Sequence, residues 1–219
     1  IGMVVLLCLP AGQAKMIRGV AFVTTAIEGL LTILLYLTYD PSTEGFQFVQ
    51  RAAWIPAFNI EYYVGVDGLS TLMLLLTGIL SFLALFWAFP IKKSVKGFHA
   101  LYLLLVTGMV GVFVALDFFL FYVFWELMLL PMYFLIGVWG GPRREYAAIK
   151  FFIYTLVGSV LILLVMLAFY FQTGTGTGPG TFSIPELIAL QPFAEASMAM
   201  QLAQFFGLFI GFAIKVPVV

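Results

Sequence analysis

The feature that most constrains this chain is a series of apolar stretches long enough to cross a lipid bilayer. A membrane-spanning helix needs about 20 mostly apolar residues, and a chain in lipid must satisfy its backbone hydrogen bonds internally. Hydropathy predicts about seven passes, the first cut short before Pro10. They lie at about residues 1–9, 19–39, 67–89, 98–116, 118–138, 147–171 and 197–219. The sequence therefore predicts an all-α, polytopic transmembrane helical bundle.

The composition agrees with this class and excludes others. Hydrophobic residues make up 63% of the chain and charged residues 9%, whereas soluble domains carry about 25% charged residues. The formal net charge of +0 excludes a nucleic-acid-binding protein. Cys8 is the single cysteine, and no paired cysteines or histidines suit a zinc or iron–sulfur site. We expect no metal or redox cofactor bound by this chain.

The loop charges predict an orientation in the membrane. Basic residues mark the cytoplasmic ends of membrane helices, and here they gather in alternate loops. Eight of the ten basic residues belong to this set, namely Lys15, Arg18, Lys92, Lys93, Lys96, Arg143, Arg144 and Lys150. The opposite loops are mainly acidic. We expect a multi-pass protein of the cell inner (plasma) membrane with its basic loops in the cytoplasm and its N-terminal end outside.

Two ionisable residues lie inside apolar segments. Glu126 belongs to the apolar and aromatic run 118–131, and Lys215 belongs to the run 205–219. A lone charge at bilayer depth costs about 2.5 to 3.5 kcal/mol on insertion scales, so both positions are candidates for function. A carboxylate that moves toward or away from a buried lysine changes the proton affinity of that lysine. The alternative is a static ion pair that joins two helices.

The residues around Glu126 also resemble a known family. Segments 117–141 and 150–159, together with Gly65-Val66-Asp67-Gly68-Leu69-Ser70 and Ala213-Ile214-Lys215-Val216-Pro217, closely resemble the antiporter-like M (ND4-type) subunits of respiratory complex I. The resemblance implies an antiporter-like fold of roughly fourteen helices, about seven of them visible here, with a broken helix 7. Residues 1–219 then form a single transmembrane domain fragment, the first antiporter-like half, truncated at both ends.

The resemblance implies roles for particular residues. Glu126 matches the glutamate of family helix 5, and Lys215 matches the lysine of helix 7, a pair held to control proton affinity in one half-channel. Pro217 matches the position where helix 7 is broken, in agreement with the hydrogen bond that a proline removes. The family's helix-8 lysine and helix-12 charged residue would lie beyond Val219.

The implied function is proton translocation in NADH:quinone oxidoreductase. In that complex the FMN, the iron–sulfur clusters and the quinone belong to partner subunits, and this chain carries no redox centre. The implied partners are other membrane subunits, especially neighbouring antiporter-like ones, and the lipid bilayer. Two alternatives remain open: a subunit of a multisubunit sodium/proton antiporter, and a membrane scaffold subunit without a transport role.

For each of the other polar residues, a structural role stands as the simpler alternative to a functional role. Lys150, Tyr154 and His99 form a possible proton path, although an interfacial histidine and a lysine that extends to the surface are common. Asp67 and Asp117 are expected to cap helices. The stretch 183–190 predicts a short helix with Ser183 as N-cap. The glycine-rich run 173–180 is expected to be a flexible connector rather than a phosphate-binding loop.

Overall fold

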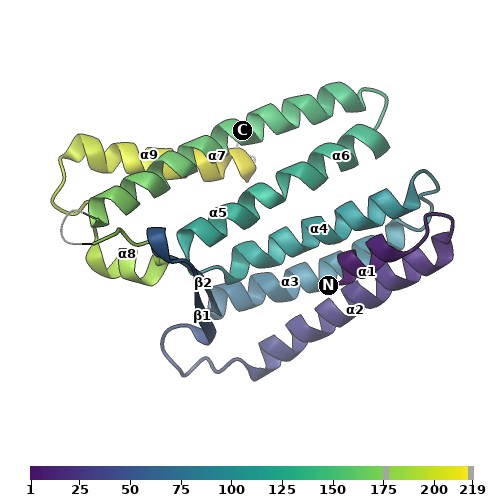
Figure 1. Cartoon of the computed structure of the whole chain (residues 1–219), viewed down its shortest axis with the longest axis horizontal. Helices are drawn as coiled ribbons and strands as arrows, with labels where there is room; N and C mark the ends of the chain where they lie inside the picture. The colour runs from purple at the N-terminus through teal and green to yellow at the C-terminus, as the bar shows by residue number, and fades with distance from the viewer. Residues whose placement is uncertain (175–177, 217–219) are drawn as a thin grey trace.

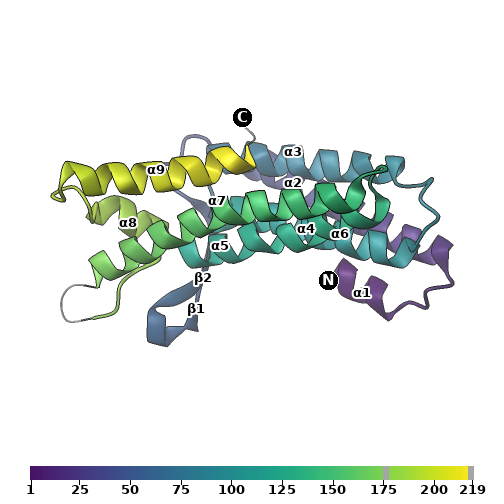
Figure 2. The ribbon, with the colours of Figure 1, turned by 90° about the horizontal axis from the view of Figure 1, so that it is seen from above.

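Long helices lying side by side make up most of the molecule, and a two-stranded hairpin crosses one end of them (Figures 1 and 2). The computed structural model describes residues 1–174 and 178–216. The elements are α1 (Gly2–Cys8), α2 (Ala14–Thr38), β1 (Gln47–Ile55), β2 (Ile60–Val66), α3 (Gly68–Trp87), α4 (Val95–Val114), α5 (Phe118–Leu127), α6 (Leu129–Trp139), α7 (Arg144–Thr173), α8 (Ile184–Leu190) and α9 (Met198–Lys215), with a 3-10 turn at Pro56–Phe58.

Within the described residues, six helical segments are long and apolar enough to cross a membrane. They are Ala14–Thr38, Gly68–Trp87, Val95–Val114, Phe118–Trp139, Arg144–Thr173 and Met198–Lys215. They correspond to the second to seventh passes predicted from the sequence, and α1 is too short in the described chain to span. Large apolar side chains such as Leu31, Leu37 and Leu69 are more than half exposed, which suits contact with lipid or with other helices. The prediction of a polytopic helical bundle is confirmed.

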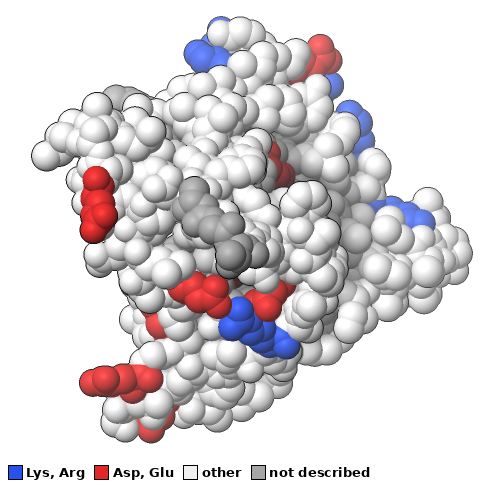
Figure 3. Space-filling view, turned by 60° about the vertical axis from the view of Figure 1, so that its left-hand side comes forward, with Lys and Arg blue, Asp and Glu red and all other residues white. Residues whose placement is uncertain are grey.

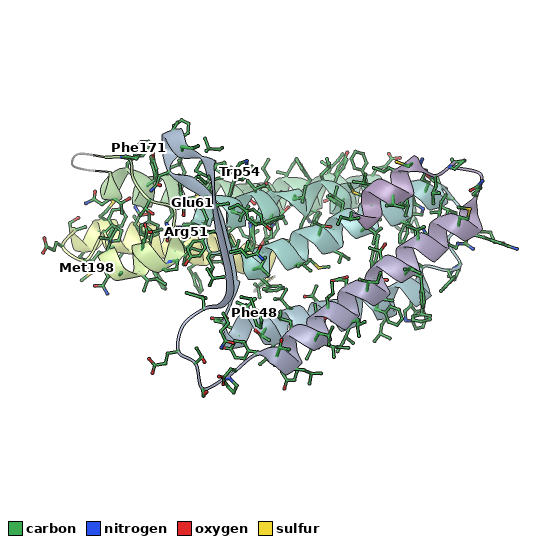
Figure 4. The ribbon with its side chains drawn as sticks, turned by 60° about the horizontal axis from the view of Figure 1, so that its bottom comes forward. Phe48, Arg51, Trp54, Glu61, Phe171 and Met198 are labelled. Atoms are coloured by element: carbon green, nitrogen blue, oxygen red, sulfur yellow. The ribbon has the colours of Figure 1, made fainter. Side chains whose placement is uncertain are left out.

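The segment 40–66, which lies between two of the passes predicted from the sequence, contains the antiparallel hairpin of β1 and β2. Strand β1 lacks the alternation of apolar and polar residues that marks a half-buried strand, and most of it is exposed. The hairpin is instead tied to α8 by charge. Arg51 of β1 forms ion pairs with Glu61 of β2 and with Glu186 of α8, the latter at 2.9 Å. Figure 4 shows Arg51 and Glu61 on the part of the hairpin next to α8.

Hydrogen bonds reinforce this connection at α8. The Thr181 hydroxyl donates to the Glu186 carboxylate at 2.7 Å. Together with Arg51, it holds the pKa of Glu186 below its usual value. The predicted short helix is confirmed as α8, with the Ser183 side chain accepting from the backbone N–H of Glu186.

Asp117 joins the hairpin to the start of α5. Its buried side chain accepts from the backbone N–H of Leu120 at 2.9 Å and of Glu61 at 3.2 Å. Burial raises the pKa of Asp117, against the lowering effect of these backbone donors. The predicted caps are confirmed at Asp117 and at Asp67, whose side chain accepts from Ser70 in a capping box.

The basic loops meet at one end of the bundle, where α1 leads into α2, α3 into α4, and α6 into α7 (right in Figure 1). Their side chains bond neighbouring backbone carbonyls: Arg18 donates to Ile91 and Lys96 to Leu7. We call this the basic end. At the opposite end, acidic groups are spread over the surface, and basic atoms lie against some of them (Figure 3). The charge alternation predicted from the sequence is therefore present in the fold.

Candidate functional site

Glu126 lies near the end of α5, beside an interruption of the helix. The pass that contains it is divided at Met128 into α5 and α6. Pro131, in the first turn of α6, lacks the N–H that would bond the carbonyl of Leu127. Discontinuous membrane helices of this kind form ion sites in transporters. The interruption was not predicted from the sequence, although Pro131 was a visible signal for it.

Two glycines of α4 allow α5 to come close. A Cβ atom at Gly108 would lie 2.6 Å from the Met128 side chain, and one at Gly111 would lie 2.2 Å from the ring of Phe124. Neither distance is tolerable for a real side chain. Small residues at these positions therefore allow the interruption, with Glu126 beside it, to pack closely against α4.

A second pair of glycines brings α9 against α7. A Cβ at Gly211 would lie 2.9 Å from the carbonyl oxygen of Gly158, and one at Gly158 would lie 3.0 Å from the Ile214 side chain. The two backbones therefore approach closely. Lys215 lies one turn after Gly211. The rings of Trp125 and Phe212, with centroids 5.4 Å apart, join α9 to α5 as well, so Lys215 comes next to the end of α5.

Lys215 binds neutral groups of Trp125, the residue before Glu126. Its Nζ donates to the backbone carbonyl of Trp125 at 2.9 Å and lies 4.2 Å from the centre of the Trp125 ring. Such a cation over an indole face is stabilised by about 0.5 to 2 kcal/mol. Ion pairs among the described residues involve Arg51 and not Lys215. The structure thus brings Glu126 and Lys215 to adjacent positions without joining them in an ion pair.

Three buried polar atoms near this contact have no hydrogen-bond partner among the described residues. They are Oε1 of Glu126, Nε1 of Trp125 and Oγ of Ser159. Buried polar groups are normally bonded, so each unpaired one calls for an explanation. In this region the polar groups are a carboxylate, an ammonium group, an indole N–H and a hydroxyl. Such a set can bind and transfer protons but offers no cluster of metal ligands, and the described chain contains no group of three His, Cys, Asp or Glu residues suited to a metal.

Lys150 and Tyr154 lie together, and His99 lies elsewhere. Lys150 and Tyr154 line a pocket of about 780 Å³ at the basic end, beside Arg143 and Arg144. His99 is only 1% exposed and its Nδ1 is bonded to the Val95 carbonyl at 2.8 Å. It is a buried residue in the second turn of α4, and it is not among the residues that line that pocket. Pro217 lies outside the described residues, so the break of helix 7 there stays a prediction.

Glu28 is a half-buried carboxylate, with one buried oxygen, that was not singled out from the sequence. It lies within α2, its Oε2 accepts from the Ser81 hydroxyl at 3.0 Å, and its Oε1 has no partner among the described residues. The signal was available, since Glu28 is a lone charge in the apolar run 19–39. The argument that singled out Glu126 applies equally to it.

Comparisons with known proteins agree with this fold. Residues 115–219 match the family described as NADH:quinone oxidoreductase/Mrp antiporter, TM. NADH-quinone oxidoreductase subunit M of Rhodobacter capsulatus is 41% identical over 209 residues, which cover 91% of this chain and 39% of that protein. F(420)H(2) dehydrogenase subunit M of Methanosarcina mazei is 39% identical over 204 residues, covering 93% and 41%. The chain thus spans about two fifths of the length of these relatives.

Solved structures show the same arrangement. A chain of respiratory complex I from Thermus thermophilus with bound NADH superposes with a TM-score of 0.81 at 29% identity, covering 99% of this chain and 42% of that one. A chain of the Mrp complex from Dietzia sp. shares the fold, with a TM-score of 0.78 at 19% identity over 98% of this chain and 23% of its own. The protein is therefore a multi-pass membrane protein of the antiporter-like class. Within this class it belongs to the M (ND4-type) subunit family of complex I, as the resemblance around Glu126 predicts.

Proposed function

We propose that this chain is part of a proton-translocating membrane subunit of NADH:quinone oxidoreductase. It would contribute the first antiporter-like half of the complete subunit. Glu126 and Lys215 would bind and release the transported proton, while other subunits carry FMN, iron–sulfur clusters and quinone. Its partners would be the adjoining membrane subunits, the antiporter-like ones among them.

The observation that carries the proposal is the arrangement of Lys215 beside the end of α5. The ammonium group is held by the carbonyl and ring of Trp125, which remain neutral whatever the state of Glu126. When Lys215 loses its proton, no carboxylate would therefore lose an ion-pair partner. Oε1 of Glu126, which has no hydrogen-bond partner among the described residues, is available to bind a proton or a water molecule. A small movement of either helix end would change their electrostatic interaction.

The route from the basic end would use α7. Lys150 and Tyr154 line the pocket there, and Gly158, where α7 meets α9, lies about 12 Å further along the helix from Lys150 at 1.5 Å per residue. The Ser159 hydroxyl, buried and unpartnered among the described residues, stands next to that contact. These groups support a hydrated path from the pocket to Lys215.

The proposed association with subunits that oxidise NADH and reduce quinone can be tested directly. We expect the complete protein, tagged and isolated in mild detergent, to copurify with subunits that oxidise NADH and reduce quinone. The reason is that a relative with 41% identity is named NADH-quinone oxidoreductase subunit M. Activity is measured on the isolated complex with NADH and a soluble quinone. Isolation of a complex that lacks such subunits and exchanges sodium for protons under an imposed gradient would favour the antiporter alternative. Oxidation of a different donor would correct the proposed substrate.

The orientation of the subunit is a separate prediction. Cysteines placed at Lys93 and Arg144 should react with a membrane-impermeant maleimide only from the cytoplasm, and a cysteine at Glu44 only from outside, since basic loops stay inside. Cys8 is exposed and must first become serine. Labelling is compared in intact cells and inverted vesicles. Reaction of the Glu44 position from the cytoplasm would reverse the proposed topology.

A further inference from the structure

A second carboxyl group lies midway along a membrane helix, in the part of the bundle formed by α2, α3 and α4. At 1.5 Å per residue, Glu28 is about 21 Å from the start of α2 at Ala14 and about 15 Å from its end at Thr38. The Glu126 site is built from α5, α7 and α9 and shares no residue with it. Glu28 therefore needs an explanation of its own.

The contacts of Glu28 are few and neutral. Ser81 of α3 donates its hydroxyl to Oε2 of Glu28 at 3.0 Å, and the Tyr102 hydroxyl of α4 donates to the backbone carbonyl of Ser81. Oε1 of Glu28 is buried and has no partner among the described residues. From α4 the titratable Tyr102 reaches Ser81 through its hydroxyl, α3 contains no charged residue, and α1 carries none. The ion pairs of the described chain do not include Glu28.

This environment suits a carboxylic acid better than a carboxylate. An ionised carboxylate can accept about four hydrogen bonds, and Glu28 receives one, from a neutral donor. At bilayer depth, an unpaired charge with so little compensation is costly. A protonated Glu28 needs a single acceptor for its O–H and keeps the bond from Ser81.

We propose that Glu28, together with Ser81 and Tyr102, forms a second proton-binding site of this chain. The site goes beyond the proposed route through Glu126 and Lys215 and does not depend on it. Its ligand is a proton rather than a metal cation, since hard cations take roughly six or more oxygen ligands, and among the described residues Oε1 is the one unpaired side-chain oxygen at this place.

Polar groups connect this site with the basic end. His99 lies one turn from Tyr102 on α4, about 4.5 Å nearer the start of that helix at 1.5 Å per residue, and is buried. Arg18 of α2 donates to the Ile91 carbonyl at the basic end. On the other side of Glu28, the buried hydroxyls of Thr32 and Thr71 donate to carbonyls of their own helical segments. The proton therefore exchanges with the basic end.

Infrared spectroscopy of the complete subunit in its native complex tests the proposal. A protonated carboxyl group has a carbonyl band separate from the bands of carboxylates. We expect Glu28→Gln to remove one protonated-carboxyl band at neutral pH, and we expect this band to shift in the wild type when water is replaced by D2O. The matched control is Glu195→Gln, an exposed glutamate, which should remove only carboxylate absorption.

Each result is decisive for the Glu28 site. An unchanged protonated-carboxyl region in a fully assembled Glu28→Gln complex would show that Glu28 is ionised and overturn the proposal. A band that is lost in the variant but does not shift in D2O would show a trapped, structural proton, which contradicts exchange with the basic end. Reduction of the band by sodium chloride relative to potassium chloride would assign the site to a cation. If Glu28→Gln fails to assemble, wild-type protein labelled with 13C-glutamate and Glu28→Asp give the same comparison.

Discussion

Replacement of Glu126 by glutamine is expected to reduce NADH-driven proton uptake about a hundredfold, the low end of what a positioned proton-transfer group contributes. Glutamine keeps the shape of the side chain and its contacts at the end of α5 but cannot take up a proton or carry a negative charge. The measurement is proton uptake by inverted vesicles that contain the complete complex, with complex content determined on native gels.

Two further variants are compared with Glu126→Gln. Glu126→Asp should retain part of the activity, because the carboxylate remains near Lys215. Glu44→Gln, at an exposed position near the hairpin, should pump at the wild-type rate. Full pumping by a normally assembled Glu126→Gln complex would reduce Glu126 to a packing residue.

Replacement of Lys215 by arginine is expected to abolish pumping as well, although the positive charge is kept. The guanidinium group stays protonated at all physiological pH values, so it cannot release a proton at this depth. Arginine also binds carbonyl oxygens and aromatic faces, so the contacts with Trp125 should survive. The rate of proton uptake is compared with that of Lys92→Arg, a change at an exposed lysine of the basic end. Normal pumping by Lys215→Arg would mean that position 215 supplies only a fixed charge.

A double variant separates proton transfer from mechanical support. Removal of both charges in Glu126→Gln with Lys215→Met leaves no unpaired charge in the membrane, so the complex should assemble normally. A proton-transfer role predicts that this complex does not pump. Wild-type pumping by the double variant would leave the two residues only a structural role.

The sequence predicted the helices and their caps because these depend on local rules. Apolar length determines which segments cross a bilayer, and Asp67, Asp117 and Ser183 mark helix starts by their side-chain chemistry. The hairpin of β1 and β2 escaped prediction because its contacts involve distant parts of the chain: Arg51, for example, contacts Glu186 across 135 positions of sequence. No periodicity within residues 47–66 contains that information.

The candidate site was predictable in its residues but not in its contacts. The cost of a charge in lipid singled out Glu126 and Lys215 from the sequence alone. The bond from Lys215 to the Trp125 carbonyl depends on how α9 meets α5 and α7, which is decided by close contacts at Gly158 and Gly211. Glu28 was missed although the same cost argument applies to it, because it is the lone charge of the apolar run 19–39.

The binding of Lys215 to a carbonyl and a ring has an electrostatic consequence. An ammonium group and a carboxylate in direct contact form a compact dipole whose field fades quickly, whereas a cation held by neutral groups acts as a full charge on its surroundings. At an effective dielectric constant of about 20, a unit charge roughly 10 Å away changes the energy of another by about 1.7 kcal/mol. That is more than a tenfold change in proton occupancy. Lys215 can therefore sense a change of charge in a neighbouring protein without any contact with it.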